Sequence, residues 1–213
     1  MKNLLFYFLF IFTFSLFSQE IKQDTTRIQN LEEVIISSIR VKQNAPIAFT
    51  NVSKDELGKK NLGQDLPILL NYLTSVVTTS DAGAGVGYTG IRIRGINAQS
   101  TNITINGIPY NDAESLGTFW VDLPDFASSV ENLQLQRGVG TSTNGSSAFG
   151  ASINILTDLI SKTPYFENSN SIGSYNTTKN TFKFSTGILN DYFEFSGRLS
   201  KIATVAAPWG LYF

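Results

Sequence analysis

The chain has 213 residues and a mass of 23.4 kDa, with 16 basic and 17 acidic side chains and a formal net charge of -1. This balance excludes a generic nucleic-acid binder, because counterion release requires a clustered basic face and the sequence contains none. The chain has no His and no Cys, which excludes disulfides, thiol nucleophiles, the usual zinc sites and Ser/His/Asp or Cys/His catalytic centres. We therefore expect neither a cofactor nor a metal. Charged residues make up 15% of the chain, against about 25% in typical soluble domains, so the surface is expected to be polar but sparsely charged.

The first 18 residues have the pattern of a secretory signal peptide. Lys2 precedes an apolar run from Leu4 to Phe17, and the polar pair Gln19-Glu20 ends this run. A membrane-spanning helix requires roughly 20 apolar residues, so the run is too short to be an anchor. We expect an exported chain, cleaved between Ser18 and Gln19.

Residues 19–44 are predicted to be a flexible leader that carries one short strand. The stretch Glu20 to Asn30 is polar and has no apolar periodicity. Residues 31–38, with the sequence LEEVIISS, favour an extended chain. This strand either lies at the edge of the following domain or pairs with another protein by β-augmentation, and the pattern alone leaves both open.

Residues 45–158 predict a compact α+β domain with a mixed sheet and short helices. Ser53 and Glu56 form a capping box for a helix that ends near Lys60. A second helical segment runs from Gln64 to Tyr72, and a third from Asp122, as its cap, to Ser129. Strands are expected at 75–79, 91–94, 103–105, 130–137 and 151–157.

The strand that ends at Gly95 alternates strictly, with Ile91 and Ile93 on one face and Arg92 and Arg94 on the other. Asn106-Gly107 follows the next strand and is a strong signal for a tight turn.

Residues 159–213 change to the pattern of a β-hairpin. Thr181 to Ile188 and Tyr192 to Leu199 alternate apolar and polar residues. The bulky apolar residues, Phe182, Phe184, Phe193 and Phe195, line one face of each strand. A transmembrane β-barrel has this pattern, with apolar groups toward lipid and polar groups toward the lumen, but an ordinary edge hairpin has it too.

Two further motifs are poor candidates for chemistry. The glycine-rich loop from Gly83 to Gly87 lacks the Lys-Ser/Thr pair and the following helix of a phosphate-binding loop. Asp112 and Glu114 have no His or Cys to cooperate with, so solvated loop acids are the better interpretation than an acid/base pair. An exported hydrolase is therefore disfavoured.

Two longer runs carry a resemblance to a known family. Ile91 to Asp112 reads IRIRGINAQSTNITINGIPYND, and Val130 to Thr157 reads VENLQLQRGVGTSTNGSSAFGASINILT. Both resemble the plug domain of TonB-dependent outer-membrane receptors, over about residues 31–157. The positions that match the family pattern are Arg94-Gly95, Asn106-Gly107, Arg137-Gly138, Gly145 and Phe149-Gly150. Ala151-Ser152 replaces the usual second Gly and Val.

The resemblance implies a role for several groups of residues. The strand at 31–38 resembles the TonB box, with coupling residues Leu31, Glu32, Glu33, Val34, Ile35, Ile36 and Ser37. The outward loops would carry the ligand-facing residues Tyr88, Tyr110, Asn111, Asp112, Glu114 and Trp120. The structural positions of the plug would be Arg92, Arg94, Gly95, Asn106, Gly107, Arg137, Gly138 and Gly150. Arg92, Arg94 and Arg137 are expected to form buried or wall-facing charge pairs.

The resemblance also implies partners and a location. The chain would be the non-enzymatic plug portion of a receptor that takes up a scarce ligand, such as an iron chelate, across the outer membrane. Its partners would be the periplasmic domain of TonB, the β-barrel of the complete receptor and the small-molecule ligand. The residues after Thr157 are too few for a barrel of even about 8 strands, so we expect a truncated receptor. The alternative is a free-standing periplasmic or surface interaction module without transport.

Overall fold

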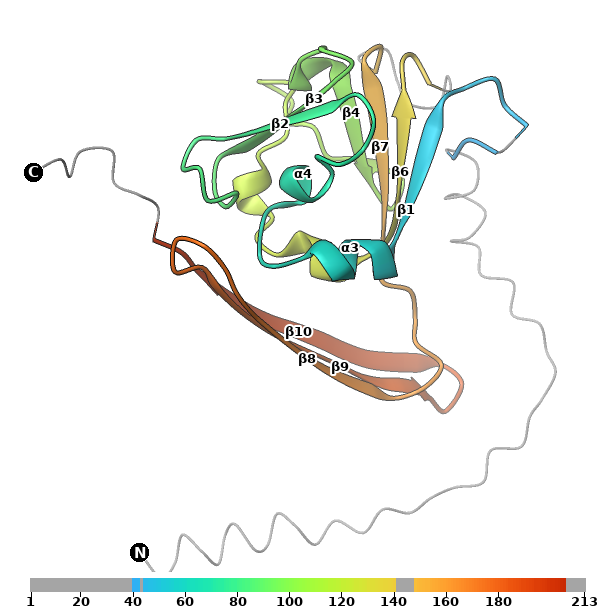
Figure 1. The fold of residues 1–213 in the computed structure, drawn as a ribbon. Helices are drawn as coiled ribbons and strands as arrows, with labels where there is room; N and C mark the ends of the chain where they lie inside the picture. The colour runs from blue at the N-terminus through green and yellow to red at the C-terminus, as the bar shows by residue number, and fades with distance from the viewer. Residues whose placement is uncertain (1–39, 43, 141–147, 206–213) are drawn as a thin grey trace, which may run out of the picture. The chain divides into compact units, whose positions relative to one another are not determined.

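The structure, a computed structural model, describes residues 40–42, 44–140 and 148–205, and the statements below refer to these residues (Figure 1). The predicted signal peptide at 1–18, the coupling strand at 31–38 and Gly145 lie outside the described residues. In the described part of the chain, no helix has the length and apolarity needed to cross a membrane.

A mixed five-stranded sheet forms the centre of the first part of the described chain, which ends with β7 (Figure 1). Along the sheet, its strands are β1 (Phe49–Ser53), β6 (Val130–Arg137), β7 (Ala151–Thr157), β4 (Thr101–Ile105) and β5 (Ile108–Pro109). Neighbouring strands are antiparallel except β4 and β7, which are parallel. The predicted strands at 130–137 and 151–157 are confirmed at both ends.

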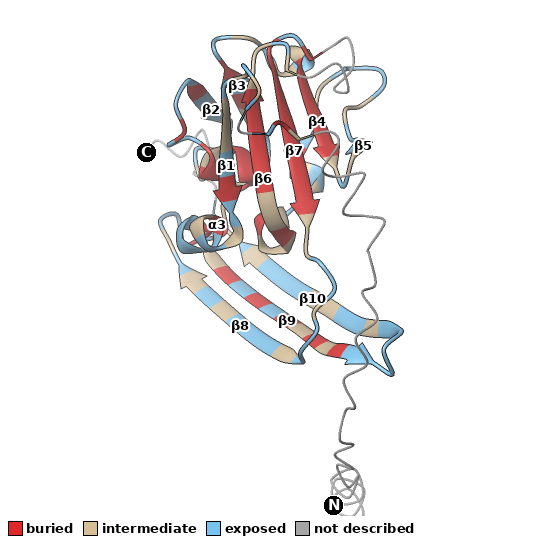
Figure 2. Ribbon diagram, turned by 90° about the vertical axis from the view of Figure 1, so that its right-hand side faces the viewer, coloured by how far each residue is buried: buried red, intermediate tan, exposed pale blue. Residues whose placement is uncertain are grey.

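The two faces of this sheet have opposite chemistry, although residues on both are buried. Leu133 and Leu135 of β6 lie opposite Ile155 and Ile153 of β7 and belong to the hydrophobic core. The alternate positions carry polar side chains that are also buried: Thr104, Gln134, Gln136, Ser152 and Asn154. Figure 2 shows how continuous the burial is along these central strands. A polar face of this kind must be satisfied by hydrogen bonds rather than by apolar packing.

The apolar face is covered by two short helices and a small hairpin. These are α3 (Lys54–Lys60), α4 (Leu66–Leu69), β2 (Val76–Ser80) and β3 (Thr89–Ile93). Leu57 of α3 and Leu66, Leu69 and Leu70 of the α4 region enter the core together with Ile91 and Ile93 of β3. The alternation predicted for β3 is confirmed, because Ile91 and Ile93 are buried while Arg92 and Arg94 are exposed.

The helix starts were predicted better than the helix lengths. Ser53 caps α3 by accepting a hydrogen bond from the amide of Glu56 at 3.3 Å. Glu56 does not complete a capping box, because its carboxylate accepts a bond from the hydroxyl of Tyr72 at 2.7 Å. The helix predicted from Gln64 to Tyr72 contracts to Leu66–Leu69, with Pro67 in its first turn as expected.

The single helix predicted from Asp122 to Ser129 is wrong. Two 3-10 turns, η2 (Trp120–Asp122) and η3 (Phe126–Ser129), replace it. Pro124 lies between them, and it has no N–H with which to continue a helix. Asp125 follows in the left-handed region, with φ of 50°, and is the N-cap residue of η3, a position predicted for Asp122.

The tight turn predicted at Asn106-Gly107 is confirmed. Both residues have positive φ, 51° and 83°, which is the geometry of a type I′ turn. The turn joins β4 to β5, with Ile105 paired to Ile108.

A separate three-stranded antiparallel sheet follows β7 along the chain, and its strand order is β10-β9-β8. Its strands are β8 (Tyr165–Ile172), β9 (Thr178–Leu189) and β10 (Phe193–Ala203). The predicted hairpin corresponds to β9 and β10, but both strands are longer than expected and β8 was not predicted.

In this second sheet the polar residues are buried and the aromatic residues are exposed, the reverse of the usual distribution. Along β9, Lys179, Thr181, Lys183 and Ser185 are buried, and Figure 2 shows the resulting alternation of buried and exposed residues. The opposite face carries a row of aromatic rings whose centroids are 4.6 Å apart for Phe166 and Phe182, and 5.8 Å apart for Phe184 and Phe195. Phe166 and Phe195 are about two-thirds exposed. A strand of a transmembrane barrel turns its apolar residues outward and its polar residues inward in the same way.

Two glycines provide a matched test of the packing. A Cβ at Gly150 would lie 2.5 Å from Cγ2 of Ile96 and 2.9 Å from the carbonyl oxygen of Ser100, whereas a Cβ at Gly58 in α3 would meet nothing within 4 Å. We predict that Gly150→Ala lowers the free energy of unfolding by about 1–3 kcal/mol through overpacking. Gly58→Ala should raise it by about 0.5–1 kcal/mol through helix propensity. Urea unfolding followed by circular dichroism measures both, and equal midpoints for the two variants would contradict the packing at Gly150.

Candidate functional site

The contact between the first part of the chain and the three-stranded sheet centres on one buried carboxylate. Asp125 directly precedes η3, and its side chain is 1% exposed. The preceding Pro124 and the left-handed backbone turn this residue away from the path of a regular helix. Asp tolerates this conformation better than most residues. The local sequence therefore places an acidic side chain where the first part of the chain contacts β9 and β10.

Donors from both parts of the chain surround the carboxylate of Asp125. From the three-stranded sheet, Lys179 Nζ lies at 2.8 Å, Thr181 Oγ1 at 2.8 Å and Arg198 Nη1 at 3.1 Å. The hydroxyl of Ser200 also donates to it. From the first part of the chain, Ser128 Oγ donates at 2.7 Å and Asn61 Nδ2 at 3.3 Å. Oδ1 thus accepts from both sides of the contact, whereas Oδ2 accepts from the three-stranded sheet.

These bonds control the protonation of Asp125. Burial alone would raise its pKa, but the hydrogen bonds from Lys179, Ser128 and Ser200, together with the charge of Lys179, outweigh burial and lower the pKa to about 2. Asp125 is therefore ionised at neutral pH and supplies the counter-charge for a lysine whose side chain is only 2% exposed.

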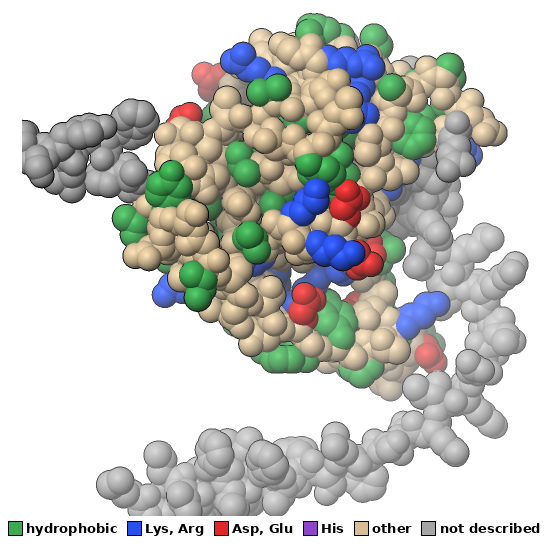
Figure 3. Space-filling view, in the orientation of Figure 1, with side chains coloured by type: hydrophobic (Ala, Val, Ile, Leu, Met, Phe, Trp, Pro, Cys, Tyr) green, Lys and Arg blue, Asp and Glu red, His purple; other side chains and the backbone are tan. Residues whose placement is uncertain are grey.

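A second carboxylate, Asp158, extends the contact beyond the end of β7. Lys183 of β9 forms an ion pair with one of its oxygens, and Lys54 of α3 binds the other at 2.7 Å. Lys54 also reaches Glu131 at 3.1 Å. Burial opposes ionisation of Asp158, but the two lysines outweigh it and lower the pKa of this carboxyl. Figure 3 shows basic and acidic side chains gathered over the region of α3.

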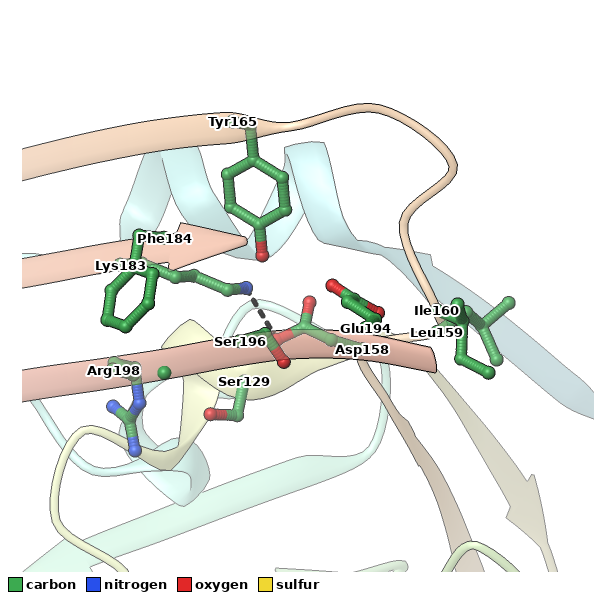
Figure 4. A pocket seen from close by; sticks show the side chains of 11 residues that line it. Ser129, Asp158, Leu159, Ile160, Tyr165, Lys183, Phe184, Glu194, Ser196 and Arg198 are labelled. Carbon is green, nitrogen blue, oxygen red and sulfur yellow. Dashed lines mark hydrogen bonds and ion pairs between the residues drawn. The ribbon is translucent and has the colours of Figure 1, made fainter. Parts of the chain in front are cut away.

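A cavity of about 400 Å³ lies beside the Asp158–Lys183 pair (Figure 4). Its wall from the first part of the chain carries Ser129, Asp158, Leu159 and Ile160, and its wall from the second sheet carries Tyr165, Lys183, Glu194 and Arg198. Glu194 is fixed at the rim, because it accepts bonds from the amide of Ser161 at 3.0 Å and from the hydroxyl of Ser185. The cavity is lined mainly by charged and hydroxyl groups, so it suits water and polar solutes better than an apolar ligand.

The contact around Asp125 is better suited to holding the two parts of the chain together than to catalysis. Every donor and acceptor around Asp125 joins one part of the chain to the other or supports such a bond. A contact of this kind specifies one docked position, because removing either partner leaves a buried charge uncompensated. It is also polar throughout, so its separation would expose charges and hydroxyls that water solvates well.

The three predicted structural arginines are placed differently from one another. Arg137 donates to the carbonyl of Thr74 at 3.0 Å and to the hydroxyl of Thr50 at 2.8 Å, and burial and the charge of Arg94 lower its pKa. Arg92 and Arg94 are exposed, and neither has a carboxylate partner among the described ion pairs. The expectation of buried charge pairs is therefore not met, and a wall-facing role stays a prediction.

The predicted ligand-facing residues lie on two loops. Tyr88, between β2 and β3, is 66% exposed. Tyr110 and Glu114 are exposed in the loop after β5, where Asp112 accepts bonds from the amides of Ser115 and Glu114 that lower its pKa. Among the described residues, no hydrogen bond or ring contact joins Tyr88 to the second loop, so a common site of the two loops stays a prediction.

Two of these six residues have structural positions instead. Trp120 is 3% exposed and packs in the hydrophobic core, so its assignment as a ligand-facing residue is corrected. Its large apolar ring follows the exposed Phe119, and the η2 turn directs it inward. Asn111 accepts a bond from the amide of Ile103 at 2.8 Å and donates to the carbonyls of Thr101 and Leu116 at 2.9 Å. Its side chain therefore shapes the loop that carries Tyr110 and Asp112.

Sequence reasoning missed the charged contact altogether. The residues that form it are Asp125, Asp158, Lys179, Lys183 and Arg198. One signal was present, because Lys179, Thr181, Lys183 and Ser185 recur at every second position opposite the phenylalanines of the same strand. Alternating lysines on the face opposite an aromatic row indicate an inward polar face that needs acidic partners.

Comparison with known proteins shows one family. The family model described as TonB-dependent Receptor Plug Domain matches residues 41–152. The fold is similar to the ferric yersiniabactin uptake receptor of Yersinia pestis, at 20% identity and a TM-score of 0.53, over 74% of this chain and 24% of that one. It is also similar to the ferric-catecholate import receptor of E. coli K12, at 19% identity and a TM-score of 0.56, over 75% of this chain and 22% of that one. The chain thus spans about a quarter of the length of these structures. No curated protein matches the sequence.

Removal of the central charge should weaken the contact strongly. Asp125→Asn leaves Lys179 and Arg198 without a counter-charge, and we predict a loss of about 3 kcal/mol or more in the free energy of unfolding. Asp122→Asn is the matched control, because Asp122 is exposed and three residues earlier, and it should change the free energy by about 0.5 kcal/mol or less. Urea unfolding, combined with amide exchange along β9, measures both variants. Equal stability of the two would contradict the role of Asp125.

The same contact predicts a dependence on acid. The pKa of Asp125 is about 2 in the folded chain, and that of an unperturbed Asp is about 3.9. The ionised carboxylate therefore contributes about 2 kcal/mol of stability above pH about 4, and this contribution is lost as the pH falls through 2. We expect the difference in unfolding free energy between wild type and Asp125→Asn to shrink between pH 4 and 2. A difference that is constant over this range would count against the assignment.

Proposed function

Because the chain belongs to the TonB-dependent receptor plug domain family, we propose that it is the plug portion of an outer-membrane receptor for active uptake of a scarce ligand. Receptors of this family are non-enzymatic transporters of the outer membrane. The plug would close the lumen of a barrel, and β8 to β10 would form the first part of the surrounding wall.

One observation carries this proposal: the three-stranded sheet turns charged and hydroxyl side chains toward the plug and aromatic rings away from it. Lys179 and Lys183 are buried on the inner face, while Phe166 and Phe195 are exposed on the outer face. A barrel wall in a membrane requires this inverted distribution, because its outer face contacts lipid and its inner face contacts a polar interior.

The ligand is proposed to be a ferric siderophore. The similar solved structures bear names of this class: one is a ferric yersiniabactin uptake receptor, one a siderophore receptor of Acinetobacter baumannii and one a ferric-catecholate import receptor. On this chain, the candidates for contact with such a ligand are the exposed Tyr88, Tyr110 and Glu114 and the half-buried Asp112, with Asn111 as their support. Aromatic and hydrogen-bonding side chains on two loops suit a bulky, polar chelate.

Energy would enter through residues 31–38. Pairing with an added strand uses backbone hydrogen bonds, so this segment can be gripped by TonB whatever its exact side chains. Glu32 and Glu33 keep the free strand soluble and discourage its self-association. A pull on this strand would rearrange the plug and open a path for the ligand, and the export of the chain would follow from its first 18 residues.

The alternative of a free-standing interaction module fits the outer face of the second sheet poorly. Phe195 and Leu199 are 64% and 72% exposed there, and Tyr192 in the turn before β10 is 92% exposed. A water-soluble module would gather such residues in an interface or a core, and a contiguous exposed row is an aggregation hazard.

Binding to TonB tests the proposal directly. We predict that the mature chain retains the periplasmic domain of TonB in a pull-down, and that Val34→Pro abolishes retention, because proline removes a backbone donor from the added strand. Gln23→Pro makes the same substitution in the leader outside residues 31–38, and it should leave retention unchanged. Equal retention by both variants would show that residues 31–38 are not the coupling strand.

A further inference from the structure

The chain enters the plug across the polar face of the five-stranded sheet. Val41 lies against this face and is 6% exposed, although its side chain is not part of the hydrophobic core. Its amide donates to Gln134 Oε1 at 2.8 Å, and its carbonyl accepts from Gln134 Nε2 at 3.1 Å. One amide side chain thus holds both backbone groups of one residue, as a neighbouring strand would.

Gln134 is well placed to resist a pull on the N-terminal segment. It lies in the middle of β6, which pairs with β1 on one side and with β7 on the other, and it is 2% exposed. Its amide nitrogen also donates to Asn51 Oδ1 of β1 at 2.9 Å, and its oxygen accepts from Gln136 Nε2 at 3.0 Å. The side chain is therefore fixed from several directions in the one orientation that fits Val41.

Arg40 supplies a second attachment next to the first. Its guanidinium donates to the carbonyl of Asn154 at 3.3 Å and lies 3.5 Å from the carbonyl of Asn132. The pairing of β6 with β7 shifts register between Val130 and Asn132. A bulge of this kind leaves backbone carbonyls of the ladder without a strand partner. Arg40 lies within reach of one carbonyl there, that of Asn132 at the end of the bulge.

The attachment is polar, in contrast to the opposite face of the sheet. Detaching residues 40 and 41 would free the side chain of Gln134 and the carbonyls of Asn132 and Asn154, and on the same polar face Asn154 Nδ2 is buried with no hydrogen-bond partner among the described residues. Water can satisfy all of these groups once the segment leaves. Detachment would not open the hydrophobic core, because Leu133, Leu135 and Ile153 face the other way.

We propose that Gln134 is a positioning residue that latches the entering chain at Val41, so that a pull on the N-terminal segment is delivered to the centre of β6 and first breaks this latch. The mechanical part of the inference rests on the proposed coupling function, whereas the latch itself does not. Release of the latch would precede any loss of strand pairing in the plug.

Amide exchange in the full chain tests the latch. In Gln134→Leu, we expect the amide of Val41 to exchange at least tenfold faster than in the wild type, because its acceptor is gone. Asn51→Ala is the matched control: it removes another partner of Gln134 but leaves Val41 bound, and the Val41 amide should exchange within twofold of the wild-type rate. Unchanged protection of Val41 in Gln134→Leu, with the amides of β6 still protected, would overturn the proposal.

Force measurements on single molecules test the order of events. Because the chain has no cysteine, Asn30→Cys and Lys59→Cys provide unique handles for optical tweezers. We expect a first extension step at low force that disappears in Gln134→Leu. Val41→Pro removes the same N–H without altering the sheet and leaves one of the two bonds to Gln134, so it should lower the force of this step if Gln134→Leu does not fold. A first step at unchanged force in Val41→Pro overturns the proposal. These measurements contain no TonB, so a failed TonB pull-down would refute the coupling function and leave the latch standing.

Discussion

A buried carboxylate at the contact between η3 and the three-stranded sheet is the constraint on which the arrangement of this chain depends. Asp125 lies at a contact where a lysine is almost fully buried, and neither charge is stable there without the other. The backbone of Asp125 is left-handed, and the turn before it contains Pro124. Local backbone geometry in the plug is therefore coupled to the position of β9 and β10.

Both attachments of the plug use the same chemistry. Asp125 and Asp158 bind the second sheet through ion pairs and hydroxyls, and Gln134 binds the entering chain through an amide. None of the residues that make these attachments belongs to the hydrophobic core. Polar contacts exchange protein partners for water at modest net cost, whereas opening the core would expose apolar surface. A plug built in this way can change its external contacts while its core stays intact.

The sequence predicted the local features well and the contacts between them poorly. The boundaries of β6 and β7 follow from alternation bounded by glycine-containing loops, and the turn at Asn106-Gly107 follows from two residues that accept positive φ. The strand β8 was missed because its centre, Asn168 to Ser171, is polar on both faces. Trp120 was assigned to the surface from its place in a loop, and only the packing of η2 shows that it is buried. The partners of Asp125 in the three-stranded sheet are more than fifty positions away, and no local pattern specifies such pairs.

The position of β1 at the margin of its sheet has a consequence for how the plug comes apart. Among the strands that the structure describes, β1 pairs only with β6, and beyond β6 the pairings to β7 and β4 do not involve it. Peeling β1 away would leave a smaller sheet whose remaining ladders are complete, with the parallel β4–β7 pair at its heart. The sheet can therefore lose its strands one at a time from the edge formed by β1. The strands that stay paired can serve as a template when the sheet forms again.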